Sequence, residues 1–123
     1  MRYLSNSWIA ATAAALAEAE PLAIALTVGY IVTGGPDGDR RYSMIYGPER
    51  ATCIEGVNEA DVSLATDWQT AIAIAQGTSS PQRAFLDGHL RLDGDAIVLI
   101  DCQDGIAEFE SYLTAVKSAT SYT

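Results

Sequence analysis

Residues 60–95 read ADVSLATDWQTAIAIAQGTSSPQRAFLDGHLRLDGD, and this stretch contains most of the signals that decide the fold. Apolar and polar side chains alternate in 61–66 and again in 88–94, which is the pattern of half-buried strands. Between these segments the apolar side chains recur at helical spacing instead. The stretch therefore predicts a strand, a helical region and a second strand in succession.

The helical region divides into two predicted helices. Asp67 is placed to cap the first helix, because an aspartate side chain can accept a hydrogen bond from a first-turn N–H, and Gly77 is placed to end it. Pro81 suits the first position of a second, short helix that runs to about Leu86, before Gly88. The apolar face of the first helix consists of Trp68, Ile72 and Ala75.

Upstream of this stretch, the sequence predicts one helix followed by three strands. The helix begins at Asn6 or Ser7, either of which can act as its cap, and it ends near Pro21. Alternating apolar side chains then predict a long strand that ends at the turn sequence GGPDGD, and a second turn, GPER, follows the return strand. The three predicted strands are 24–32, 42–46 and 51–55.

Downstream, two segments carry different signals. Asp95 can cap the segment AIVLIDCQ as a helix, but the β-branched residues of that segment favour a strand, so both structures remain open. The final segment is clearer, because four apolar side chains recur at helical spacing and predict a C-terminal helix with one apolar face. These side chains are Ile106, Phe109, Leu113 and Val116.

The order of the elements predicts an α+β fold. Strands and helices are grouped rather than strictly alternating, which is typical of helices packed on one face of a mainly antiparallel sheet. The chain has 123 residues, which fits one domain spanning 1–123.

Composition limits the function classes. The formal net charge is −9, whereas a protein that binds nucleic acid needs a basic face. The apolar stretches are too short or too interrupted to span a bilayer, so no transmembrane segment is expected. Cys53 and Cys102 have no metal-site or disulfide-framework spacing, which favours a reducing cytoplasm, and we expect neither a metal nor a cofactor.

The single histidine, His89, lies in the last strand of the quoted stretch. Successive strand side chains point to opposite faces, so Leu90 and Leu92 share one face while His89, Arg91 and Asp93 share the other. If the leucines enter the core, the imidazole faces solvent. A structural or solvated histidine is therefore the favoured interpretation.

Residues 60–95 resemble the second half of sterol carrier protein type 2 domains. The matching features are a strand, a helix ending in glycine, the dipeptide AF before a glycine, an alternating strand, and then a glycine with a capping residue. The resemblance implies that DAIVLIDCQ is helical, that the sheet has five strands, and that helices enclose an apolar tunnel. The segment SATSYT lacks a peroxisomal signal of the Ser-Lys-Leu type, so we expect a free-standing domain of bacterial type.

The resemblance also implies non-covalent binding and carriage of lipids, such as fatty acids, acyl-CoA or sterol-like molecules. Aromatic and pliable side chains on helix faces toward the sheet suit an adaptable pocket, and Tyr30, Tyr42 or Tyr46 would orient a polar head. Ile31 is included although it lies opposite the main alternating face of its strand. The candidate ligand-binding residues are Trp8, Ile31, Met44, Trp68, Ile72, Phe85, Leu86, Ile97, Ile100, Phe109 and Leu113.

Two other function classes remain open at this point. A small isomerase or cyclase would use Asp87, His89 or a tyrosine as acid or base in the same cavity. An accessory module would use the sheet edge or the alanine-rich first helix to form a homodimer. Because the chain is acidic, its ligand donor could also be a protein rather than an anionic membrane.

The alternation of side chains between the two faces of the last strand predicts the outcome of three substitutions. His89→Ala should leave melting temperature and ligand binding nearly unchanged, because surface changes usually cost within about 0.5 kcal/mol. Leu90→Ala or Leu92→Ala should destabilise the fold, since truncating a buried leucine costs roughly 2–5 kcal/mol. Thermal melting and binding are measured together, and a His89→Ala protein that melts normally but loses function would favour the enzyme.

Overall fold

The protein was analysed as a computed structural model. It describes residues 2–18, 25–36, 38–48, 50–57, 59–102, 104, 108 and 111–121.

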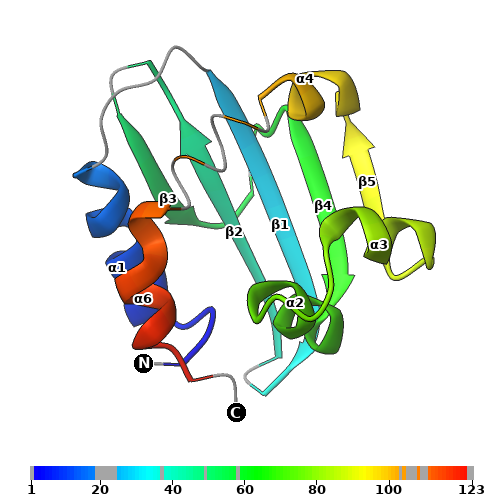
Figure 1. The fold of residues 1–123 in the computed structure, drawn as a ribbon, viewed down its shortest axis with the longest axis horizontal. Helices are drawn as coiled ribbons and strands as arrows, with labels where there is room; N and C mark the ends of the chain where they lie inside the picture. Colours follow the sequence, from blue (N-terminus) through cyan, green and yellow to red (C-terminus); the bar gives the residue numbers. More distant parts are fainter. Residues whose placement is uncertain are drawn as a thin grey trace.

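Five strands form one mixed sheet in the order β3-β2-β1-β4-β5 (Figure 1). β1 and β4 are parallel at its centre, and the other neighbouring pairs are antiparallel, which confirms the predicted mainly antiparallel sheet. The strands are β1 (Leu26–Gly35), β2 (Gly38–Tyr46), β3 (Ala51–Glu55), β4 (Val62–Asp67) and β5 (Leu90–Gly94).

The first hairpin is tighter than the sequence predicted. The expected strand ended at Val32, but β1 continues to Gly35 and β2 already begins at Gly38. The register shifts between Val32 and Gly35, and Gly34 and Gly38 both adopt positive φ, at 73° and 90°. Glycine has no Cβ to oppose this conformation, so most of the predicted turn sequence joins the ladder.

All of the described α-helices except the last begin at a side-chain cap. Ser5 caps α1 by accepting a hydrogen bond from the Trp8 N–H at 3.2 Å, so the expected caps Asn6 and Ser7 were wrong by one or two residues. Asp67 caps the next helix, as predicted. The helices are α1 (Asn6–Ala17), α2 (Trp68–Ala75), α3 (Pro81–Leu86), α4 (Ala96–Asp101) and α6 (Thr114–Ser118), with a 3-10 turn η1 (Ser111–Leu113) before the last.

The segment after Asp95 is helical, as the family resemblance implied and contrary to its strand propensity. The Asp95 carboxylate accepts hydrogen bonds from the N–H groups of Ile97 and Val98, at 3.1 and 3.2 Å. These bonds satisfy donors that the first helical turn leaves unpaired. The local cap therefore outweighs the weak preference of β-branched residues for strands.

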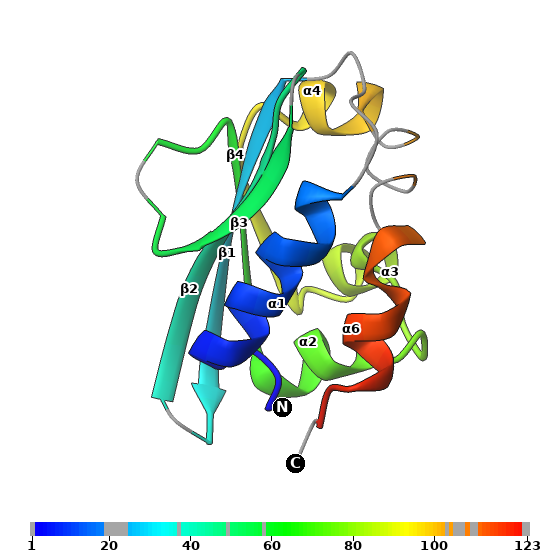
Figure 2. The same cartoon turned by 90° about the vertical axis from the view of Figure 1, so that its left-hand side faces the viewer.

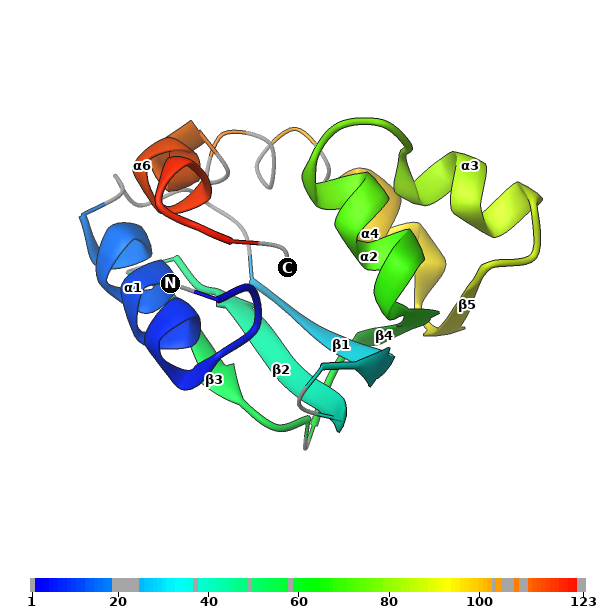
Figure 3. The same cartoon turned by 90° about the horizontal axis from the view of Figure 1, so that it is seen from below.

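The described helices cover one face of the sheet, as Figure 2 shows edge-on. They form two groups: α1 and α6 lie over the β3–β2 end, while α2, α3 and α4 lie over the β4–β5 end (Figure 3). Among the described residues, none of the helices has the length and apolar character that crossing a membrane requires.

The core lies between α1 and the inner face of the sheet. Leu16, Val28 and Val62 are fully or almost fully buried there, and the Trp8 indole packs edge-on against the Tyr42 ring at 5.3 Å. On the C-terminal segment, the buried side chains of Leu113 and Val116 belong to the same core. The other two members of the predicted apolar stripe, Ile106 and Phe109, lie outside the described residues.

The predicted orientation of the side chains in the last strand is confirmed. Leu90 is buried, Leu92 is half-buried, and His89, Arg91 and Asp93 are exposed.

One buried hydroxyl in α1 generates a stability prediction. Thr12 is 0% exposed, and its Oγ1 has no hydrogen-bond partner among the residues that the structure describes. Thr12→Val keeps the shape of the side chain and removes the unsatisfied group, so it should raise the free energy of unfolding by about 1–3 kcal/mol. Denaturant unfolding measures the change.

The matched control is Thr114→Val, because Thr114 is exposed on α6. Its hydroxyl donates to the Ser111 carbonyl oxygen at 3.1 Å, so Thr114→Val should lower the free energy of unfolding, by no more than about 1 kcal/mol. Equal effects of the two substitutions would contradict the assignment of an unsatisfied hydroxyl at Thr12.

Candidate functional site

A row of paired residues crosses the inner face of the sheet, with tyrosines on β2 and β1 and leucines on β4 and β5. Tyr30 of β1 is paired with Tyr42 of β2 on one side and with Leu64 of β4 on the other, and Leu64 is in turn paired with Leu92 of β5. Paired residues of neighbouring strands point to the same face. The register therefore produces a polar end over β1 and β2 and an apolar end over β4 and β5.

An apolar groove lies at the β4–β5 end, with a volume of about 420 Å³. Small-molecule sites typically have volumes of about 300–1,000 Å³. The sheet forms its floor, and α3 and α4 form its walls. The lining residues are Leu64, Leu90 and Leu92 from the sheet, Pro81, Gln82, Phe85 and Leu86 from α3, and Leu99 and Ile100 from α4.

Several large apolar side chains of this groove face solvent. Leu86 is 83% exposed, Ile100 63% and Phe85 55%. Single exposed apolar residues are common on proteins, but these three side chains lie on two different helices around one groove. Clustered exposure of this kind marks a surface that binds an apolar molecule or a partner.

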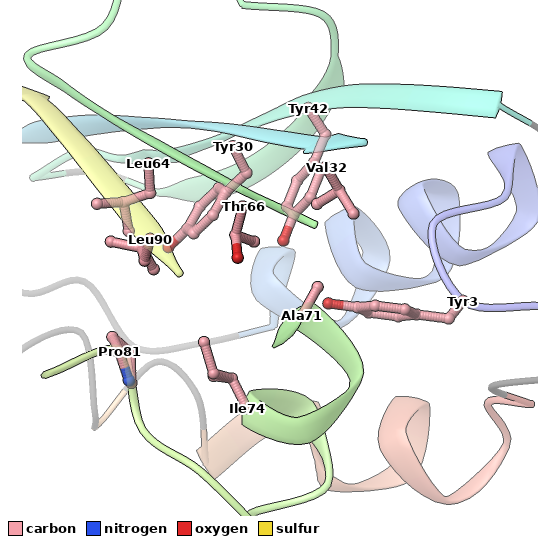
Figure 4. A pocket seen from close by; sticks show the side chains of 10 residues that line it. All are labelled: Tyr3, Tyr30, Val32, Tyr42, Leu64, Thr66, Ala71, Ile74, Pro81 and Leu90. Atoms are coloured by element: carbon pink, nitrogen blue, oxygen red, sulfur yellow. The ribbon is translucent and has the colours of Figure 1, made fainter. Parts of the chain in front are cut away.

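A smaller inner pocket of about 80 Å³ lies behind the groove. It shares Leu64, Pro81 and Leu90 with the groove, so the two spaces adjoin. In Figure 4, side chains from the sheet, from α2 and from the segment before α1 converge on it. The remaining lining residues are Tyr3, Tyr30, Val32, Tyr42, Thr66, Ala71 and Ile74.

The tyrosine rings are held by one another and by Trp8. Tyr30 and Tyr42 stack with ring centroids 4.8 Å apart, and Tyr3 packs edge-on against Trp8 at 5.3 Å. Burial raises the pKa of Tyr42 well above 10.0, and the neighbouring phenols of Tyr3 and Tyr30 raise it further. Tyr42 is therefore a neutral hydroxyl at any physiological pH.

Three of the candidate ligand-binding residues line the groove: Phe85, Leu86 and Ile100. Ile97 is on the same helix as Ile100 and is 71% exposed, but it does not line the groove. Ligand contact by these residues stays a prediction.

The other candidates lie elsewhere. Trp8, Met44 and Leu113 are in the core, while Trp68 and Ile72 are half-buried on α2. Ile31 is paired with Arg41 and Ala65 in a row of side chains on the outer face of the sheet, away from the helices and the groove. Phe109 lies outside the described residues.

Several groove residues were not predicted as ligand-binding, namely Leu64, Pro81, Gln82, Leu90, Leu92 and Leu99. The parity of Leu90 and Leu92 was visible in the sequence, but it indicates burial and not whether a pocket adjoins the side chain. Of the three tyrosines proposed to orient a head group, Tyr30 and Tyr42 line the inner pocket, and Tyr46 does not.

Asp87 and His89, the residues proposed for catalysis, are both exposed and line neither apolar space. His89 borders a separate, open hollow together with Asp67 and Arg91. The Asp67 carboxylate accepts a 2.8 Å hydrogen bond from the Thr70 N–H, which lowers the pKa of Asp67 and ties it to helix capping.

Comparison with known proteins identifies similar chains. The model of the SCP-2 sterol transfer family matches residues 32–104. Palmitated SCP2L2 from Aedes aegypti has a TM-score of 0.64 at 17% identity, covering 86% of this chain and 95% of that one. A conserved hypothetical protein, possibly a sterol carrier protein, from Thermus thermophilus has a TM-score of 0.62 at 17% identity, with coverages of 98% and 92%. No curated protein matches the chain.

Burial of two acidic groups on the sheet predicts alkaline instability. Burial raises the pKa of the Cys53 thiol from 9.0 to about 12, and that of the Tyr42 phenol from 10.0 upward. From pH 9 upward the unfolded chain loses these protons while the folded chain retains them, so the melting temperature should fall toward pH 12. Tyr42→Phe removes one of the groups and should lose fewer degrees between pH 8 and 11. Parallel melting curves for the two proteins would contradict the burial of this phenol.

Proposed function

This chain belongs to the SCP-2 sterol transfer family, and from that premise we propose that it binds an apolar small molecule of the lipid class in the groove. The molecule is carried and released without covalent change. The inner pocket receives one end of it, and the groove covers the rest.

The observation that carries this proposal is the exposed apolar lining of the groove. Leu86, Ile100 and Phe85 keep more than half of their surface in water, on two helices that face each other across Leu90 and Leu92. A ligand with a dozen buried methylenes gains roughly 10 kcal/mol from leaving water, at about 0.8 kcal/mol per methylene. Association costs an uncertain ~4–15 kcal/mol, so moderate affinity with loose selectivity is the expected result.

Carriage accounts for the groove better than catalysis does. An acid or base must come within hydrogen-bond reach of its substrate, or act through one water. The exposed positions of Asp87 and His89, outside the groove and the inner pocket, give no support to an isomerase or cyclase that uses either residue. A second copy of the chain would also cover Leu86 and Phe85, and the experiment below separates that outcome from ligand binding.

The two free cysteines support a reducing cytoplasmic location. Cys53 is buried and Cys102 is half-buried. Secreted proteins in oxidising compartments more often hold such residues in disulfides.

The test is binding of the neutral apolar dye Nile red to the full chain, with native mass spectrometry of the protein as purified. We expect saturable binding with one dye per chain, and added mass from any lipid retained during expression. Leu86→Glu and Ile100→Glu should each weaken dye binding by about tenfold or more, because each replaces apolar lining with a charge.

The matched control is Ile54→Glu, because Ile54 is another partly exposed apolar residue, on β3 at the opposite end of the sheet. Its affinity for Nile red should stay within about twofold of the unsubstituted protein. If the folded protein binds no dye, or if all three variants lose binding equally, the groove is not the binding site. Sedimentation over a concentration series shows whether a dimer covers the groove instead.

A further inference from the structure

We propose that the rim of the groove is a docking surface for a basic amphipathic helix of a partner protein. The rim consists of Phe85 and Leu86 of α3 together with Ile97 and Ile100 of α4. Both helices lie over the β4–β5 end of the sheet, on the side away from α1 and α6 (Figure 1). The inference goes beyond the proposed function, because docking does not require a bound ligand.

The rim exposes more apolar surface than a ligand inside the groove would cover. Ile97 is 71% exposed and does not line the groove, although it lies about one helical turn from Ile100 on α4. Leu86 lines the groove but keeps 83% of its surface in water. A small molecule in the groove leaves Ile97 uncovered, so the exposure of Ile97 needs another explanation. Clustered apolar side chains of this kind mark the interaction surfaces of proteins.

The shape of the surface favours a helix over a flat partner. The rim residues stand on two helices, and the groove between them reaches down to Leu90 and Leu92 of the sheet, with a volume of about 420 Å³. Amphipathic helices commonly bind by laying their apolar face into such a groove. Side chains three and four positions apart share one face of a helix, so one partner helix can contact α3 and α4 at once.

The carboxylates around α4 select a basic partner. Residues 92–104 contain four aspartates and neither Lys nor Arg, and all four aspartates are exposed: Asp93, Asp95, Asp101 and Asp104. Asp95 precedes α4 and Asp101 is its last residue, so negative charges flank the rim residues of this helix at both ends. Lysine or arginine on the partner would meet charges of opposite sign, and their long stems would also cover apolar surface.

The two arginines in this part of the chain do not reverse its charge. Arg83 Nε lies 3.9 Å from a carboxylate oxygen of Asp87, and Arg91 Nε lies 3.7 Å from one of Asp93. Each arginine is therefore matched by an acidic neighbour. Residues 81–104 hold two arginines and five aspartates, which is a net charge of −3 with the histidine neutral.

Two other occupants match these charges less well. A second copy of the chain in a symmetric dimer would bring the same aspartates toward one another, and like charges across an interface are costly. An anionic membrane would be repelled by the aspartates and by the net charge of −9. A basic helix meets neither penalty.

The experiment measures binding of a fluorescein-labelled peptide to the full chain by fluorescence anisotropy. The peptide contains only leucine and lysine, with the leucines on one helical face, and it is about 14 residues long, which is roughly four turns. We expect saturable binding at low salt that weakens as the ionic strength rises. A peptide with glutamate in place of lysine, and one of the same composition with the leucines spread around the helix, should each bind at least about tenfold more weakly.

Two substitutions test the apolar and the charged part of the surface separately. Ile97→Gln should weaken peptide binding by about three- to tenfold, because it removes an exposed apolar contact. It should leave the affinity for Nile red within about twofold, since Ile97 does not line the groove. Asp101→Asn should weaken peptide binding by about two- to fivefold at low salt and have no effect at high salt, where the charge is screened.

The matched controls are Ile54→Gln and Glu55→Gln, because both residues are exposed on β3 at the opposite end of the sheet. Neither substitution should change the affinity for the peptide by more than about twofold, since charges beyond a Debye length are largely screened. Circular dichroism checks the fold of each variant, and all four substituted positions are exposed.

The outcomes separate docking from ligand carriage. Equal affinity for the lysine and glutamate peptides, or equal effects of Ile97→Gln and Ile54→Gln, would overturn the docking surface while Nile red binding still supports a carrier. Peptide binding that Ile97→Gln weakens would support the docking surface even if Nile red does not bind.

The same variant identifies the other occupants. If the lysine peptide does not bind, sedimentation and flotation with phosphatidylcholine vesicles show whether a dimer or a lipid surface covers the rim. Either form of association, if Ile97→Gln abolishes it, would overturn the helix as the occupant.

Discussion

The parallel pairing of β1 with β4 at the centre of the sheet is the constraint on which the rest of the structure depends. It joins a three-stranded meander, β3-β2-β1, to the β4–β5 pair. Because Tyr30 is in register with both Tyr42 and Leu64, the phenols of one part and the leucines of the other share a continuous inner surface. The two groups of helices cover the two ends of this surface. The groove and the inner pocket then lie along one path, from the open edge at β5 toward the centre of the sheet.

Most individual elements could be predicted from the sequence because their signals are local. Asp67 and Pro81 start helices through hydrogen bonding and fixed φ within a few residues, and strand parity placed Leu90 inward and His89 outward without knowledge of any neighbour. Where two local signals compete, sequence reasoning is weaker. The segment after Asp95 needed the family resemblance, since its β-branched residues and its capping aspartate indicate different structures. The order of strands could not be derived in this way, because pairing depends on residues far apart in the chain.

The candidate site was less predictable than the fold for a physical reason. A side chain that lines a groove and one that fills the core obey the same periodicity, and only the position of the covering helices distinguishes them. Phe85, Leu86 and Ile100 were identified because they lie on helices, whereas Leu64, Leu90 and Leu92 were assigned to the core or passed over. Trp8 and Met44 were also named as ligand-binding, but both are buried in the core and line neither the groove nor the inner pocket. Ile31 was named as ligand-binding although its side chain alternates with the inward-facing ones of its strand. The register places it on the outer face of the sheet, away from the helices.

The aromatic contacts of Tyr3 give the protein an intrinsic spectroscopic sensor. Its ring lies 5.3 Å from the Trp8 ring and 5.5 Å from the Trp68 ring, so both tryptophans of the chain contact one side chain of the inner pocket. A molecule that enters the pocket changes the surroundings of Tyr3, and through it those of both indoles. Occupancy can therefore be followed by the ultraviolet emission of the unlabelled protein, in real time and without chemical modification. Trp8→Phe and Trp68→Phe would divide that signal between the α1 side and the α2 side of the pocket.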